Sequence, residues 1–189
     1  SNFAGIAFPY FADKAAGRNV RLVAVEPTSC PTLTKGVYAY DYGDATGLTP
    51  LLKMHTLGHD FVPPGIHAGG LRYHGMSPLI SHVYELGMME AQAIPQTECF
   101  SAAVQFARTE GIVPAPEPAH ALALAIREAE KAKETGEETV ILTALCGHGH
   151  FDMQSYMDFA DGKLKDLDYD EGELAKSLAS LPIERVAAA

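Results

Sequence analysis

Cys146 and the glycines that follow it are the first residues whose types and order could do chemistry. The segment 146–150 reads Cys-Gly-His-Gly-His and follows an almost wholly apolar run, 139–146, which is typical of a buried strand. Ligands of α/β proteins bind beyond the carboxyl ends of such strands, and glycine lets the backbone approach a ligand closely. The pattern favours a ligand loop that the Cys146 thiol faces. The alternative is a tight turn whose histidines face solvent.

Arg72 lies in a second glycine-rich segment, 67–77, which reads His-Ala-Gly-Gly-Leu-Arg-Tyr-His-Gly-Met-Ser. A guanidinium can bind a carboxylate or a phosphate through two parallel hydrogen bonds, which the point charge of a lysine cannot do. Arg72 is therefore a candidate anion clamp. A structural arginine that ties down loop carbonyls would have the same sequence context, and both interpretations stay open.

Glu117 is the third candidate. Prolines at positions 114, 116 and 118 hold the chain extended up to a helix that is expected over 119–133. A carboxylate at a helix N-terminus is stabilised by the helix dipole. Capping alone would explain Glu117, whereas a role in a site requires it to face the same cleft as Cys146.

Histidine spacing raises the question of a metal site. His55 and His59 are four residues apart, and His148, His150 and Asp152 alternate as they would on a strand. The first pair has a glycine between its members and lacks the intervening catalytic glutamate, and the second group has no evident further ligand. The signal is weak, so a metal-dependent hydrolase that uses His148, His150 and Asp152 stays a minor alternative.

Periodicity and turn residues define the elements that must position these side chains. Helices are expected over 3–16, 77–87, 98–111 and 119–133, and strands over 20–26, 91–95 and 139–146. Thr97 would cap the third helix, and the second would bury a face made of Leu79, Ile80, Val83 and Leu86. The segment 26–72 is expected to be a long irregular excursion with a short hairpin, and 161–189 a peripheral tail. Helices that alternate with buried strands predict an α/β domain with a largely parallel sheet.

Composition excludes several classes of protein. The 189 residues carry a formal net charge of −10, and 47% of them are hydrophobic, so a globular domain with a substantial core is expected. Scattered basic residues argue against binding to nucleic acid. The longest nearly apolar run, 3–12, is too short to span a membrane. Three widely separated cysteines, Cys30, Cys99 and Cys146, fit a reducing compartment, so a cytoplasmic protein is expected.

Four segments together carry a resemblance to a known family. They are 1–7, Ser-Asn-Phe-Ala-Gly-Ile-Ala; 70–75, Gly-Leu-Arg-Tyr-His-Gly; 108–117, Arg-Thr-Glu-Gly-Ile-Val-Pro-Ala-Pro-Glu; and 147–149, Gly-His-Gly. The chain resembles, in order and over nearly its whole length, the tryptophan synthase beta chain, and within it the divergent second, beta-like type. The resemblance implies that 1–189 is the C-terminal part of the catalytic region of a fold type II pyridoxal-phosphate-dependent enzyme. The Schiff-base lysine would then lie in an upstream part.

The resemblance implies a cofactor site for pyridoxal 5'-phosphate. Ser1 and Asn2 match the last two positions of the family's phosphate cradle, Gly-Gly-Gly-Ser-Asn. Cys146, followed by Gly147, matches the residue that hydrogen-bonds the pyridine nitrogen of the cofactor, which is usually serine or threonine. A thiol makes a weaker hydrogen bond than a hydroxyl there. Glu117 matches the glutamate near the cofactor ring, where it helps to hold reactive intermediates.

The resemblance also bears on the substrate. Ordinary members carry aspartate at the position of Arg72, where it contacts the serine hydroxyl, whereas the second type resembles this chain. A guanidinium inverts the local charge and could favour a negatively charged leaving group, as in phosphoserine. The backbone of Tyr73 and Gly75 falls where the family binds a monovalent cation.

The activity implied is a β-replacement lyase that makes L-tryptophan from indole and L-serine or phosphoserine. A homodimer is expected, and whether an alpha-type subunit binds is left open. This chain alone is expected to be inactive. The main rival is a catalytically inactive structural or dimerising fragment, which predicts exposed apolar surface where an absent half would pack.

Overall fold

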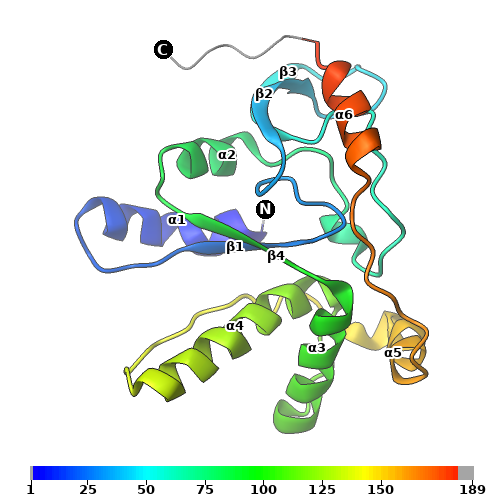
Figure 1. The fold of residues 1–189 in the computed structure, drawn as a ribbon. Coiled ribbons are helices and arrows are strands. Elements are labelled where there is room, and N and C mark those ends of the chain that lie inside the picture. The colour runs from blue at the N-terminus through cyan, green and yellow to red at the C-terminus, as the bar shows by residue number, and fades with distance from the viewer. Residues whose placement is uncertain (1, 183–189) are drawn as a thin grey trace.

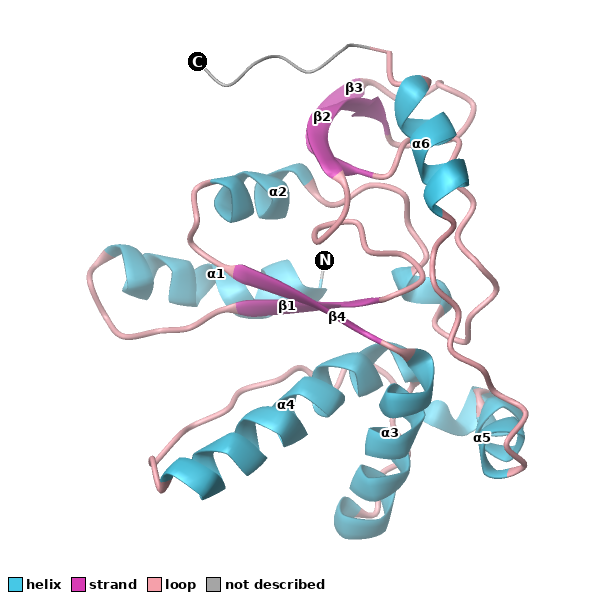
Figure 2. Cartoon of the chain, in the orientation of Figure 1, coloured by secondary structure: helices cyan, strands magenta, loops and turns pink. Residues whose placement is uncertain are grey.

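Two parallel strands with helices on both faces form the centre of a computed structural model that describes residues 2–182 (Figures 1 and 2). The helices are α1 (Asn2–Ala15), α2 (Pro78–Glu85), α3 (Gln96–Glu110), α4 (Pro116–Thr135), α5 (Met153–Ala160) and α6 (Glu171–Ala179). The strands are β1 (Val23–Pro27), β2 (Val37–Tyr42), β3 (Leu51–Thr56) and β4 (Glu90–Ile94). Short 3-10 helices are η1 (Gly69–Leu71) and η2 (Gly149–Phe151).

The parallel pair β1–β4 divides the core into two layers. Its register runs from Val23 opposite Glu90 to Pro27 opposite Ile94. Because successive side chains of a strand point to opposite faces, Ala24 packs with α1 and α2, whereas Val25 packs with α3 and α4. The prediction of an α/β fold with parallel strands is confirmed.

The excursion between β1 and α2 contains a hairpin, as expected, and the hairpin is regular. β2 and β3 pair in antiparallel register over six residues each, from Val37 opposite Thr56 to Tyr42 opposite Leu51. The hairpin forms a separate two-stranded sheet, on the same side of β1–β4 as α2 (Figure 2).

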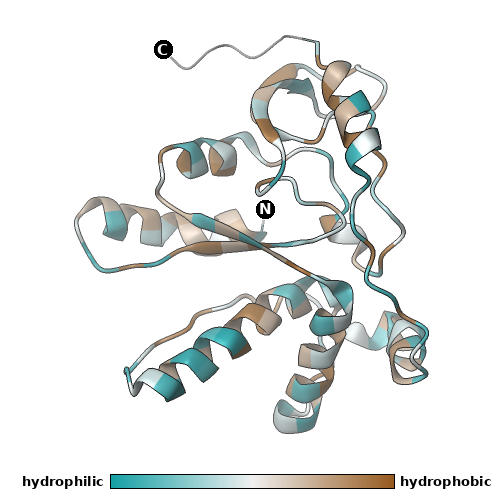
Figure 3. Cartoon of the chain, viewed as in Figure 1, coloured by the Kyte–Doolittle hydropathy of each residue, from teal (hydrophilic) through white to brown (hydrophobic). Residues whose placement is uncertain are grey.

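The strand predicted over 139–146 is wrong. This segment is extended but has no strand partner among residues 2–182, and it runs back beside α4 as a loop in which hydrophobic positions recur (Figures 2 and 3). Val140 is 94% exposed and Leu142 is 60% exposed. A strand needs a neighbour for its backbone N–H and C=O groups, so apolar and β-branched residues alone do not make one.

Two local predictions about helices are also wrong. Thr97 is not the N-cap of α3, because Pro95 precedes the helix and the Thr97 N–H and hydroxyl both donate to the Asp166 carboxylate. Leu79 and Leu86 are 64% and 60% exposed. They lie about 100–120° around α2 from buried Ile80, outside the stripe that contacts the core.

The C-terminal region is packed against the domain. Leu174 of α6 belongs to a core cluster with Cys30, Leu57 and Phe61. The expectation of a peripheral tail over 161–189 did not include this packing, because one leucine in a charged stretch gives little sequence signal. Within residues 2–182, the structure contains no helix that is both long and apolar enough to span a bilayer.

Candidate functional site

The N-terminal end of α1 lies toward the carboxyl end of the parallel strand β1. A tight turn at Gly17, with φ +85°, sends α1 antiparallel to β1, so the Asn2 end of α1 lies toward the carboxyl end of β1 (Figure 1). Asn2 is exposed there, and the free N–H groups of a helix N-terminus favour an anion. Ser1, the other predicted phosphate ligand, lies outside the described residues.

The turn after Cys146 is held against the start of α4. The Ala115 N–H donates to the Gly147 carbonyl at 3.0 Å, and the Gly149 N–H donates to the Val113 carbonyl at 2.7 Å. A Cβ added to Gly147 would lie 3.0 Å from the Ala115 Cβ. These contacts place Gly147 next to the first turn of α4 and leave Cys146 exposed.

Glu117 joins this turn to the glycine segment at 69–71. It is the second residue of α4, is half-buried, and its Oε1 accepts the Gly70 N–H at 2.9 Å. A Cβ on Gly70 would lie 3.1 Å from the Glu117 Cγ, so only glycine allows this approach without displacement. The three predicted clusters therefore converge at the start of α4.

Arg72 is tied to its own loop. Its Nε donates to the Pro64 carbonyl at 3.0 Å and its Nη2 donates to the Pro63 carbonyl at 2.8 Å. These contacts match the structural-arginine alternative and use one edge of the guanidinium. The Tyr73 carbonyl, predicted as a cation ligand, accepts the Thr32 hydroxyl at 2.9 Å, and Gly75 forms a β-bridge with Thr56.

Asp152 follows the same turn, and neighbouring charged groups affect its pKa. Burial, and then the Glu117 carboxylate, raise the pKa of Asp152, while His148 and His67 oppose the shift. Its side chain makes no capping hydrogen bond to α5. From the sequence, Asp152 was predictable only as a metal ligand, since nothing in its local sequence indicates a neighbouring carboxylate 35 positions away.

Replacing Asp152 with asparagine tests this environment. The folded state binds the Asp152 proton more tightly than the unfolded chain does, so the group contributes its full stability below the usual aspartate pKa and loses it as pH rises through the raised pKa. We expect Asp152→Asn to have a higher Tm than wild type at pH 7 and the same Tm at pH 3. If Asp152→Asn and wild type have the same Tm at pH 7 as well as at pH 3, the pKa of Asp152 is not raised.

Two buried polar groups stand out in the structure: Glu26 had no sequence signal, whereas His120 follows the Glu117 motif without a role that the sequence could predict. Glu26, near the end of β1, is 5% exposed, and burial raises its pKa although three protein donors hydrogen-bond its carboxylate. His120 donates from Nδ1 to the Pro116 carbonyl, its Nε2 has no partner, and burial lowers its pKa. Both occur among ordinary strand and helix residues, so only burial distinguishes them.

The predicted histidine groups do not form a metal centre. His55 pairs with Glu85 at 2.7 Å, and His59 pairs with Asp41 at 2.6 Å. The His148 ring accepts the His150 backbone N–H. Within the described part of the chain, no group of three or more His, Cys, Asp or Glu side chains is arranged to hold a metal ion, so the hydrolase alternative lacks a ligand set there.

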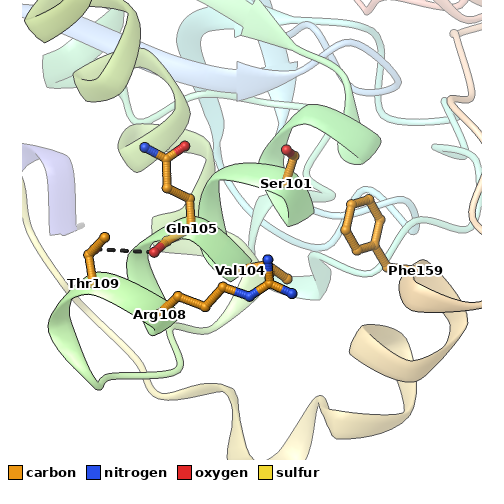
Figure 4. A pocket seen from close by; sticks show the side chains of 6 residues that line it. All are labelled: Ser101, Val104, Gln105, Arg108, Thr109 and Phe159. Atoms are coloured by element: carbon orange, nitrogen blue, oxygen red, sulfur yellow. Dashed lines mark hydrogen bonds between the residues drawn. The ribbon is translucent and has the colours of Figure 1, made fainter.

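A surface groove lies away from these residues. It is a groove of about 550 Å³ between α3 and α5 (Figure 4), lined by Ser101, Val104, Gln105, Arg108, Thr109 and Phe159. None of these residues belongs to the clusters that converge on α4. We therefore place the candidate site at the start of α4.

The chain is similar in sequence to known proteins. Similar proteins include tryptophan synthase beta chain 2 of Aquifex aeolicus, 61% identical over 88% of this chain and 39% of the relative. The Thermotoga maritima and Methanosarcina mazei proteins of the same name are each 60% identical, over 83% and 87% of this chain and 37% and 38% of theirs. The chain thus spans under two fifths of these relatives.

A sequence model of the family described as pyridoxal-phosphate dependent enzyme matches residues 1–147. That match includes α1, both parallel strands, and the glycine segment and turn that meet at Glu117. Because the matched region covers more than three quarters of the chain and contains the site, the chain belongs to the family of pyridoxal-phosphate-dependent enzymes.

Proposed function

We propose that this chain forms the C-terminal part of a cytoplasmic, homodimeric lyase that makes L-tryptophan from indole and L-serine or phosphoserine. The observation that carries the proposal is the convergence of Gly70, Glu117 and Gly147 beside the exposed Cys146 thiol. Identity of about 60% to tryptophan synthase beta chain 2 proteins supports the same activity. An alpha-type subunit is a candidate partner.

The residues present fit pyridoxal phosphate. The exposed Cys146 thiol can hydrogen-bond a pyridine nitrogen, and the close approach of Gly147 to Ala115 leaves no room for a side chain beside it. The first turn of α1, with Asn2, would hold the phosphate. When bound, the cofactor supplies an electron sink for charge that develops at the α-carbon of an amino acid.

The chain's own residues would bind and orient. Glu117 would hold the glycine segment at 69–71 through the Gly70 N–H and present its second carboxylate oxygen toward the reacting groups. Arg72 would use the edge of its guanidinium that does not bond the Pro63 and Pro64 carbonyls to bind an anionic β-substituent. Of the two carbonyls predicted to bind a monovalent cation, that of Gly75 would be the ligand, because the Tyr73 carbonyl already accepts hydrogen bonds from Thr32 and Cys30.

The segment 139–146 would pair with a strand from the part of the relatives that this chain does not span. The segment is apolar and extended, and hydrogen bonds anchor the chain just after its end, at Gly147. A neighbouring strand would therefore only have to pair with its backbone N–H and C=O groups. The same exposed apolar side chains favour the second candidate function, a structural or dimerising fragment without activity.

The deciding experiment uses what we call the completed enzyme. It is this chain fused to the part of the Aquifex aeolicus relative that it does not match. The proposal predicts visible absorption from bound pyridoxal phosphate, a shift of that absorption when L-serine is added, and tryptophan formation with indole. Absorption that stays blank with excess cofactor would contradict the enzyme and favour the inactive fragment.

Arg72→Ala separates the two roles of this residue. In the completed enzyme we expect kcat/KM for phosphoserine to fall by about 10–100-fold, because one charge-assisted contact is lost, while kcat/KM for serine changes little. Arg72→Lys is the control that retains charge without the planar fork. Equal losses for both substrates would assign Arg72 to tying the Pro63 and Pro64 carbonyls alone.

A further inference from the structure

Helix α6 closes a small apolar cluster beside the loop 57–75. Leu174 packs with Cys30, Leu57 and Phe61. The helix also lies directly on Gly58, whose φ is +91°, since a Cβ there would come within 2.5 Å of the Ser177 carbonyl oxygen. The Ser177 hydroxyl and backbone therefore pack directly against the backbone of Gly58, and a side chain at position 58 would collide with α6.

Two members of this cluster hold the backbone around Tyr73. The Cys30 thiol donates to the Tyr73 carbonyl at 3.1 Å, and the Leu57 N–H donates to the His74 carbonyl at 2.7 Å. Cys30 and Leu57 are almost fully buried, and Leu174 belongs to the same cluster. Displacement of α6 would therefore loosen the supports of the segment that contains Arg72.

A second anchor lies nearer to Glu117. The Gln96 Nε2 donates to the Lys165 carbonyl at 2.6 Å, and the Gln96 Oε1 accepts the His67 N–H at 3.3 Å. The neighbouring Asp166 carboxylate accepts the Thr97 N–H and hydroxyl at 2.9 and 2.7 Å. Gln96 thus joins the C-terminal region to the residues just before Gly70, the partner of Glu117.

We propose that 161–182, the C-terminal clamp, positions the loop 57–75 for substrate binding. The clamp reaches this loop at two points, at Gly58 near its start through α6 and at His67 near its middle through Gln96. This inference rests on the proposed function for its kinetic consequence. Docking of the clamp can be tested without measuring enzyme activity. The docked clamp buries Cys30, so the reactivity of the Cys30 thiol reports whether the clamp is in place.

The chain contains internal controls for a thiol-labelling test in the completed enzyme. Cys146 is exposed, so its rate of modification is that of an accessible thiol. Modification of Cys30, which packs against α6, measures the undocking of this helix. Modification of Cys99, in the core between α3 and α4, measures global unfolding. Leu174→Ala removes the side chain that completes the Cys30 cluster. Lys176→Ala, on the exposed side of α6, is the matched control because, among residues 2–182, Lys176 forms an ion pair with Glu173 alone.

With an alkylating reagent and peptide mass spectrometry, we expect Leu174→Ala to speed modification of Cys30 by at least about 10-fold, through local opening, with Cys99 unchanged. The KM for the amino-acid substrate should rise about 5–10-fold with a smaller change in kcat, and Lys176→Ala should match wild type. Asp166→Ala, which frees the other anchor, should raise the same KM.

Three results would overturn the clamp. They are continued protection of Cys30 in Leu174→Ala, reaction of Cys99 together with Cys30, and accelerated Cys30 labelling with an unchanged KM. The first two remain readable in an enzyme without tryptophan-forming activity. A failure of the proposed function therefore appears as wild-type inactivity with normal labelling, which is distinct from a failure of the clamp.

Discussion

Glu117→Ala lowers kcat/KM for tryptophan formation by the completed enzyme about 100-fold or more. The side chain that joins Gly70 to the start of α4 is lost. With it goes the carboxylate that we propose acts on the reacting groups. Misplacement of a bound substrate by about 1 Å can cost this much. Steady-state kinetics with saturating cofactor measures the effect.

Glu117→Gln is the matched control, because an amide oxygen still accepts the Gly70 N–H while the charge is gone. If Glu117 acts on the reacting groups, the glutamine variant also loses activity, by about 10-fold or more. Wild-type activity in Glu117→Gln would restrict the residue to holding the glycine segment at 69–71.

Glu26→Ala lowers the free energy of unfolding by about 3 kcal/mol. The buried carboxylate accepts the Leu33 N–H at 2.9 Å, the Thr34 N–H at 2.8 Å and the Thr34 hydroxyl at 2.6 Å. Removal leaves the buried Leu33 N–H and the part-buried Thr34 donors without this acceptor. A buried donor without an acceptor costs about 1–3 kcal/mol and a part-buried one less, and the loss is partly offset because a desolvated charge is removed. Urea titration of the completed enzyme and the variant measures the difference.

Glu26→Gln serves as the control for Glu26→Ala. It retains one acceptor oxygen, so we expect a smaller loss of stability than in the alanine variant. Glu26 holds the turn between β1 and β2, and Cys30 and Thr32 of this turn donate hydrogen bonds to the Tyr73 carbonyl. The alanine variant should therefore weaken these two hydrogen bonds as well. Equal stability of wild type and Glu26→Ala would contradict this account.

The parts of this protein that depend on local interactions could be predicted from its amino-acid sequence. Helix ends at Gly17 and Gly111 were predictable because these residues adopt positive φ values that favour glycine. The position of Glu117 in the first turn of α4 followed from the flanking prolines. The family was also identifiable, because its motifs occur as short continuous segments that match known relatives.

Tertiary structure alone decided which of these residues meet. Gly70 and Glu117 are 47 positions apart, and Thr97 and Asp166 are 69 apart, so no local pattern could pair them. The run 139–146 has the composition of a strand, yet strand formation needs a neighbouring backbone that residues 2–182 do not supply. Leu174 packs into the core because the fold brings Cys30 and Leu57 to it. Burial and long-range pairing depend on the whole arrangement of the chain, and local sequence does not encode them.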